Sequence, residues 1–67
     1  MIKKGNWLRF TLANYSHDDD GEVIKKLTDE VREGKVLFAC VDTLIVEVEG
    51  VLAPFYVEVE DVVEVVK

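Results

Sequence analysis

Two short segments, Ile45-Val46-Glu47-Val48-Glu49 and Tyr56-Val57-Glu58-Val59-Glu60, carry the plainest structural signal in the chain. In each of them valine alternates with glutamate, which gives one apolar and one acidic face. A period of two residues is typical of a strand with one buried face. A loop containing Gly50 and Pro54 joins the segments. We therefore predict an antiparallel hairpin.

The register of this hairpin follows from placing its valines in the core. Directly opposed residues of an antiparallel pair point to the same side of the sheet. This pairs Val46 with Val59 and Val48 with Val57 inside. The outer face then holds Ile45 against Glu60, Glu47 against Glu58 and Glu49 against Tyr56. Like charges directly opposite each other, such as Glu47 and Glu58 in this register, destabilise a sheet. The acidic residues of the outer face are therefore not explained by the stability of the sheet.

Two elements are predicted upstream. Residues 7–13 alternate apolar and polar side chains and indicate a strand, and residues 14–21 indicate a loop. A helix is predicted between Asp19 and Gly34. Its apolar residues Val23, Ile24, Leu27 and Val31 share one stripe. Asp19 and Glu22 have the spacing of a capping box, and Gly34 fits a left-handed helix end.

The expected fold is α+β, a single domain over residues 1–67. From Lys35 onward the chain indicates strands, with a turn at 42–43 and a loop at 50–55. The predicted order is β-α-β-β-β, a small antiparallel sheet of four to five strands with the helix packed on one face. Residues 61–67 fit either a fifth strand or a helical turn. A small SH3-like or Sm-like barrel is the alternative fold.

Composition limits the environment and the stabilisation of this domain. Hydrophobic residues make up 49% of a short chain, more than one small core needs, which predicts self-association as a homodimer. Cys40 is the only cysteine, so no internal disulfide forms. We expect it to be a buried core residue. The N-terminal segment has no apolar stretch of a signal peptide, and the cytosol is the expected compartment.

Charge is distributed unevenly along the chain. The net charge is −6, which disfavours nucleic acids and anionic membranes as direct partners. Residues 1–35 contain seven acidic and seven basic side chains, whereas residues 36–66 contain seven acidic and no Lys or Arg side chains. We predict a partner-binding surface for a basic protein centred on four glutamates and extended by three further carboxylates. The residues are Glu47, Glu49, Glu58, Glu60, Asp42, Asp61 and Glu64.

In size, acidity and its acidic sheet face, the chain resembles the small phage-encoded proteins that mimic DNA. The resemblance includes no aligned motif. Members of that class occupy host DNA-binding proteins, among them HU-type nucleoid proteins, restriction enzymes and uracil-DNA glycosylase. It implies a non-enzymatic inhibitor without a cofactor, whose partner is a basic, HU-like DNA-binding protein. A homodimer would extend the acidic surface to the length of a DNA site.

Other interpretations remain open at this stage. The acidic face could serve solubility alone in a generic interaction module. Asp18 to Asp20 could bind Ca²⁺ or Mg²⁺ weakly, although placing Gly21 at the sixth position of an EF-hand loop puts Leu27 where the bidentate Glu belongs. No nucleophile, zinc or phosphate-loop pattern is present, but an enzyme subunit completed by another chain is not excluded. Trp7 could be an anchor residue of a protein interface, or it could cover the end of the core. The loop from Val51 to Phe55 could form a dimer contact, or it could fold back over the core.

Overall fold

The computed structural model describes residues 1–67, and it is an all-β protein. Five strands form one antiparallel sheet in the order β4-β3-β2-β1-β5. Their bounds are β1 Trp7–His17, β2 Val23–Ala39, β3 Thr43–Glu47, β4 Phe55–Glu58 and β5 Val62–Val65. A single 3₁₀ turn, η1, spans Val59–Asp61. No helix is long and apolar enough to cross a membrane.

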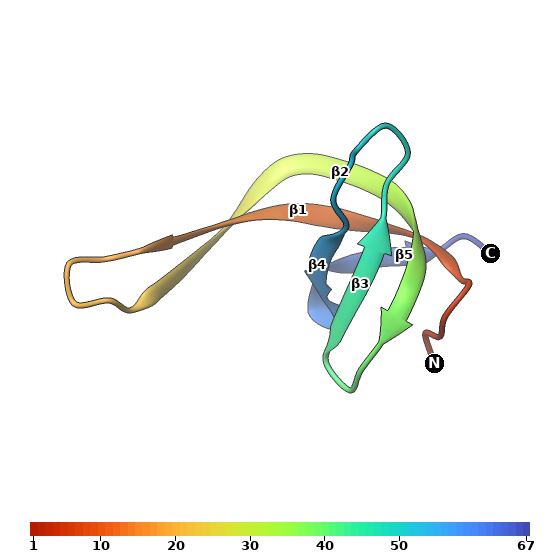
Figure 1. The fold of residues 1–67 in the computed structure, drawn as a ribbon, viewed down its shortest axis with the longest axis horizontal. Helices are drawn as coiled ribbons and strands as arrows, with labels where there is room; N and C mark the ends of the chain where they lie inside the picture. The colour runs from red at the N-terminus through yellow and green to blue at the C-terminus, as the bar shows by residue number, and fades with distance from the viewer.

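The sheet is strongly curled (Figure 1). β2 bends along its length, so that β3 and β4 cross in front of β1 and β5. β1 and β4 are in contact although they are not hydrogen-bonded neighbours. The alternative prediction of a small barrel is also all-β, but β4 and β5 are both unpaired edges and hydrogen bonds do not close this sheet.

Seven apolar side chains from the curled sheet form the core. They are Leu8, Phe10, Val36, Leu44, Val46, Val48 and Val57. Phe55 packs against this cluster with its ring centroid 6.2 Å from that of Phe10. Only nine of the 67 residues are buried, so a large share of the apolar side chains faces outward.

The predicted helix between Asp19 and Gly34 is wrong, and so is the α+β class. Residues 23–34 of this segment lie in β2, which pairs with β1 from Lys35 opposite Trp7 to Val23 opposite His17. Val23, Ile24, Thr28 and Val31 are β-branched, a composition that favours strands. Asp18, not Asp19, organises the turn, because its Oδ1 accepts hydrogen bonds from the backbone N–H groups of Asp20 and Glu22.

Gly34 has a different role from the predicted helix end. It is buried in β2 and is not among the glycines with positive φ. A Cβ atom at Gly34 would lie 2.5 Å from Val46 Cγ1 and 2.6 Å from the Glu47 carbonyl oxygen. Glycine therefore permits the close approach of β2 and β3 at the bend of the sheet.

The β1–β2 hairpin extends well beyond the rest of the sheet (Figure 1). We call residues 12–28 the arm. At its base three residues of β2, 28–30, oppose Leu12 alone. Thr28 Oγ1 donates a hydrogen bond to the Leu12 carbonyl oxygen at 2.9 Å and accepts one from the Glu30 N–H. An irregularity of this kind bends the strand, and it marks where the arm leaves the body.

The predicted β3–β4 hairpin is present, but its register is wrong by four residues. The structure pairs Leu44 with Val57 and Thr43 with Glu58, where the sequence had suggested Val48 and Glu47 as their partners. Alternation of faces does not fix register, since a shift by an even number of residues keeps every side chain on its own face. Residues 48–54 form the connecting loop, in which Gly50 has φ 84°.

Candidate functional site

Four of the seven predicted partner-binding residues come together at one corner of the body. The end of β4 lies beside the start of β3, with Glu58 opposite Thr43 and the Val59 N–H donating to the Asp42 carbonyl oxygen at 3.0 Å. η1 follows directly and carries two further acidic residues. We call this set the acidic corner; it consists of Asp42, Glu58, Glu60 and Asp61.

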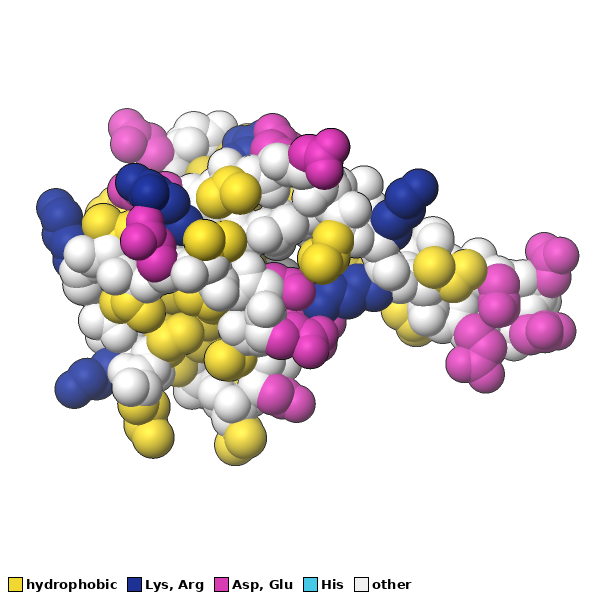
Figure 2. All heavy atoms as spheres, turned by 180° about the vertical axis from the view of Figure 1, so that it is seen from behind, with side chains coloured by type: hydrophobic (Ala, Val, Ile, Leu, Met, Phe, Trp, Pro, Cys, Tyr) yellow, Lys and Arg dark blue, Asp and Glu magenta, His cyan; other side chains and the backbone are white.

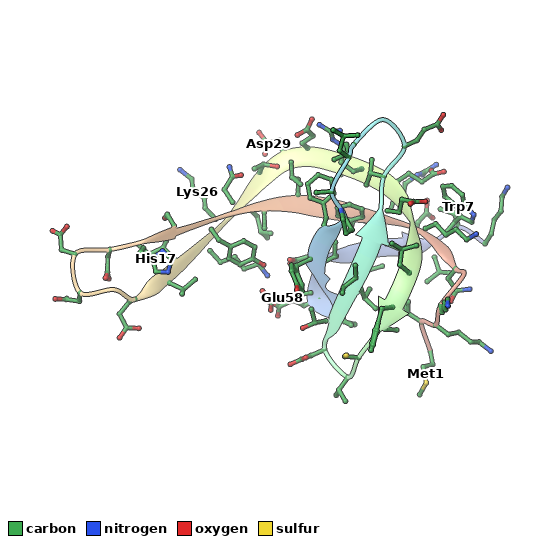
Figure 3. The ribbon with its side chains drawn as sticks, in the orientation of Figure 1. Met1, Trp7, His17, Lys26, Asp29 and Glu58 are labelled. Atoms are coloured by element: carbon green, nitrogen blue, oxygen red, sulfur yellow. The ribbon has the colours of Figure 1, made fainter.

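One lysine from the arm reaches into the acidic corner. Lys25 Nζ lies 3.0 Å from Glu58 Oε1, 3.0 Å from Glu60 Oε1 and 2.8 Å from Asp61 Oδ2. Its side chain is only 22% exposed. Figure 3 shows Glu58 on the side of the body that faces the base of the arm. Four carboxylates and one ammonium group leave the corner with a net charge of −3.

Tyr15 provides the second contact between arm and corner. It is the cross-strand partner of Lys25, so both side chains point to the same side of the arm. The Tyr15 hydroxyl donates a hydrogen bond to Glu58 Oε1 at 3.0 Å. The same carboxylate oxygen therefore accepts from both residues, which holds Glu58 in one orientation.

These contacts shift the pKa values of three groups. The hydrogen bond to Asp61, with those to Glu60 and Glu58, raises the pKa of Lys25. The hydrogen bonds from Lys25 and Tyr15 lower the pKa of Glu58. Burial, followed by its bond to Glu58, raises the pKa of the Tyr15 phenol. At neutral pH Lys25 and Glu58 are charged and Tyr15 is neutral, so none of them is poised to exchange a proton.

The members of the acidic corner differ in accessibility. The Asp61 side chain is only 5% exposed and serves to anchor Lys25. The Glu60 side chain is 71% exposed, and Asp42 is also exposed, with its Oδ1 accepting a bond from Thr43 Oγ1. Glu60 and Asp42 are therefore the most open residues of the corner, whereas the Glu58 side chain is 40% exposed.

The structure places the remaining three predicted residues elsewhere. Glu47 and Glu49 are exposed and form no ion pair, but they lie at the opposite end of β3 from Asp42. Glu64, on β5, binds Arg9 Nη1 at 2.6 Å. The predicted ladder with Glu47 opposite Glu58 does not form, because Glu58 pairs with Thr43. On its other side, β3 places Glu47 opposite Lys35 of β2.

Sequence reasoning missed Lys25 and Tyr15. They lie 33 and 43 residues from Glu58, and the helix predicted for this region separated Lys25 from the sheet. The alternating pattern Tyr15-Ser16-His17 next to β-branched Val23 and Ile24 was the available signal for a longer hairpin. Only the pairing of β1 with β2 brings Lys25 to the corner.

The structure also shows where the other residues singled out in the sequence lie. Cys40 is exposed rather than buried in the core. Val51 and Phe55 pack against the core, whereas Leu52 between them is fully exposed. Trp7 is partly exposed at the end of β1 (Figure 3). No group of three or more His, Cys, Asp or Glu side chains is arranged to hold a metal ion.

Comparison with protein families, characterised proteins and solved structures yields no match for this chain.

Proposed function

We propose that this chain is a non-enzymatic binding protein that occupies the basic, DNA-binding surface of another protein and thereby blocks DNA binding. The observation that carries the proposal is the acidic corner, where three carboxylates share the single ammonium group of Lys25 and Asp42 adds a fourth negative charge. An HU-like nucleoid protein is the first partner to test, and the cytosol is the compartment.

The charge state of the corner supports binding rather than catalysis. The shifted pKa values of Glu58 and Lys25 keep both groups ionised through the neutral range. A surface with fixed negative charge attracts a basic partner and speeds its association. A general acid or base would instead need a pKa close to the working pH.

The position of Lys25 supports a basic group as the ligand of the corner. Its ammonium group is bound by three carboxylates at once. A lysine or arginine of a partner would form the same kind of charge-assisted hydrogen bond with carboxylates of the corner. Glu60 and Asp42 extend this arrangement to the solvent, and Glu47 and Glu49 add charge at the far end of β3. Asp61 and Glu64 would then contribute mainly to intramolecular ion pairs, with Lys25 and Arg9 respectively.

A second function is favoured by the ion pairs themselves. Lys25 and Arg9 partly neutralise Glu58, Glu60, Asp61 and Glu64. The acidity of the remaining surface would then serve solubility, and the chain would be a generic interaction module. The two functions differ in one respect, since only the first requires the exposed carboxylates of the corner.

A binding experiment separates them. The protein is immobilised, and purified HU and a cell lysate are passed over it at low salt, followed by a salt gradient. The test variant is Asp42→Asn/Glu60→Gln. The control variant is Asp29→Asn/Glu30→Gln, which removes the same charge from exposed residues of β2 outside the corner.

DNA-competitive inhibition predicts a basic protein that elutes at moderate salt, is displaced by duplex DNA and is retained by the control but lost on the test variant. Equal retention by both variants, or retention that DNA does not reverse, would falsify the role of the corner. The solubility interpretation would then replace it.

A further inference from the structure

The arm is a two-stranded ribbon with exposed apolar side chains. Val23 is 63% exposed and Leu27 54% exposed, and Tyr15 and Ile24 are each exposed by close to half. No third strand pairs with the arm, because β3 pairs with β2 only at residues 35–39 and β5 with β1 only at residues 8–10. An isolated ribbon of this kind is marginally stable in water, so a covering surface would stabilise it.

A second uncovered surface runs along β5. This strand is an edge of the sheet, with β1 as its only neighbour. Val63 is 58% exposed, Val65 is 50% exposed, and Val66 follows them toward the chain end. An open edge with apolar side chains is a ready site for pairing with another strand. Because β5 is short, the outer edge of β1 is free from Thr11 to His17, immediately beyond it.

Unpaired charges of opposite sign occupy the two ends of the molecule. The turn of the arm carries four carboxylates that form no ion pair, which we call the acidic tip: Asp18, Asp19, Asp20 and Glu22. Figure 2 shows these acidic side chains at the end of the arm and basic side chains at the far end of the body. The longest dimension of the molecule, 40 Å, separates the two ends.

Three exposed lysines lie at that far end, and we call them the basal lysines: Lys3, Lys4 and Lys67. They are brought together because the Lys67 carbonyl oxygen accepts hydrogen bonds from the Trp7 N–H and from Asn6 Nδ2, while the Lys3 N–H donates to Asn6 Oδ1. None of the three forms an ion pair with an acidic side chain. Lys35 lies nearby but has Glu47 as its cross-strand neighbour.

We propose that two copies of this chain form an antiparallel, two-fold dimer in which the arm of each copy lies along the β5 edge of the other and its acidic tip meets the basal lysines. Both ends fit in one arrangement, since β1 spans roughly 30 Å from Trp7 to His17 at about 3.3 Å per residue. Each β5 strand lies beside the arm of the partner. The two-fold axis repeats this contact, so the dimer contains it twice.

A closed dimer fits this surface better than an open chain. A head-to-tail contact between tip and basal lysines alone would repeat without limit and form a filament. It would also leave Val23, Leu27 and the β5 valines exposed to water. The antiparallel arrangement covers them in the same contact that pairs the charges, and apolar burial supplies most of the stability of such interfaces.

The two experiments change separate residues, although the arm also supplies Tyr15 and Lys25, which contact the acidic corner. The acidic corner contributes neither to the tip nor to the basal lysines, so failure of one experiment leaves the other intact. If the dimer and the proposed function are both correct, dimerisation covers the basal lysines and leaves two acidic corners accessible to a partner.

The test is a charge-reversal exchange measured by sedimentation velocity and light scattering over a range of concentrations. One variant reverses the tip, Asp19→Lys/Asp20→Lys, and leaves Asp18 to hold the turn. A second reverses the basal end, Lys3→Glu/Lys4→Glu. Each variant alone should raise the dimer dissociation constant by at least about tenfold.

An equimolar mixture of the two variants should restore the dimer, because each reversed tip then meets a reversed basal end. This recovery also shows that both variants are folded. Wild-type protein that stays monomeric near about 1 mM, a mass that grows beyond two copies, or variants that dimerise as the wild type does would each overturn the arrangement.

Discussion

Lys25 Nζ lies 2.8 Å from Asp61 Oδ2. This ion pair joins the arm to the 3₁₀ turn η1 of the body, between residues 36 positions apart in the sequence. Asp61 is the only buried charged residue of the protein. A buried carboxylate that loses its cation is left uncompensated. The stability of the arm–body junction should therefore depend on this pair more than on any exposed ion pair.

Replacing Lys25 by Met should lower the melting temperature clearly, because Asp61, Glu58 and Glu60 would face one another without a counterion. Adding Asp61→Asn to that variant should recover part of the loss. Thermal unfolding of the single and double variants measures their coupling. Arg32→Met is the control, since it breaks an exposed pair with Glu30 worth about 0–1 kcal/mol. Equal losses for Lys25→Met and Arg32→Met would contradict the role of Asp61.

Stability should fall in acid partly through Glu58. Its folded-state pKa is lowered below the ordinary 4.5 by Lys25 and Tyr15, so its stabilising contribution is present above pH 4.5 and is lost as the pH falls through the folded value. In urea unfolding between about pH 3 and 7, the free energy of unfolding should fall less steeply toward low pH for Glu58→Gln than for wild type. We call this low-pH part of the curve the acid limb.

Tyr15→Phe provides a graded comparison for this pH dependence. It removes the hydrogen bond from Tyr15, which lowers the pKa of Glu58 less than the bond from Lys25 does, and it leaves Lys25 in place. Its acid limb should fall between those of the wild type and Glu58→Gln. Identical limbs for all three proteins would show that the junction contributes nothing to acid unfolding.

Gly34→Ala should destabilise the protein, because the new methyl group would meet Val46 Cγ1 and the Glu47 carbonyl oxygen at about 2.5 Å. Overpacking of a close contact costs about 1–3 kcal/mol. Chemical denaturation should show this loss, whereas Lys35→Ala at the adjacent exposed position should stay within about 0.5 kcal/mol. A neutral Gly34→Ala variant would mean that β2 and β3 are further apart at the bend.

The Cys40 thiol should react with a thiol reagent in the folded protein, because its side chain is exposed before the β2–β3 turn. We expect complete labelling under native conditions, at a rate close to that of the protein unfolded in urea. Labelling that requires unfolding would place Cys40 in the interior, as its apolar sequence neighbours had suggested.

The sequence predicted the alternating faces of β3 and β4 correctly as far as Glu58, because each of these strands has one face against the core. Val59, which was expected inside, lies in η1 and is 38% exposed. The prediction failed for β2, since no apolar core covers either side of the arm, and no buried face therefore imposes a period of two on Val23 to Leu27. There the apolar residues fell by chance at helical spacing. Register failed for a related reason, because the valines at 46, 48, 57 and 59 allow several pairings with the same faces inside.

The candidate site was predictable only in part. Clustering of acidic residues after Lys35 indicated an acidic surface, and four of the seven residues named do meet at one corner. Their counterion could not be identified, because Lys25 reaches the corner through the pairing of β1 with β2 and the bend opposite Leu12. Long-range pairing of this kind has no local sequence signal.

The pairing of β1 with β5, which sets Leu8 opposite Val65, joins two strands that lie far apart along the chain. Until β5 pairs, the outer edge of β1 that carries the core residues Leu8 and Phe10 is open. Completion of the sheet must wait for a contact of very high sequence separation, which places this small domain among the slower folders of its size.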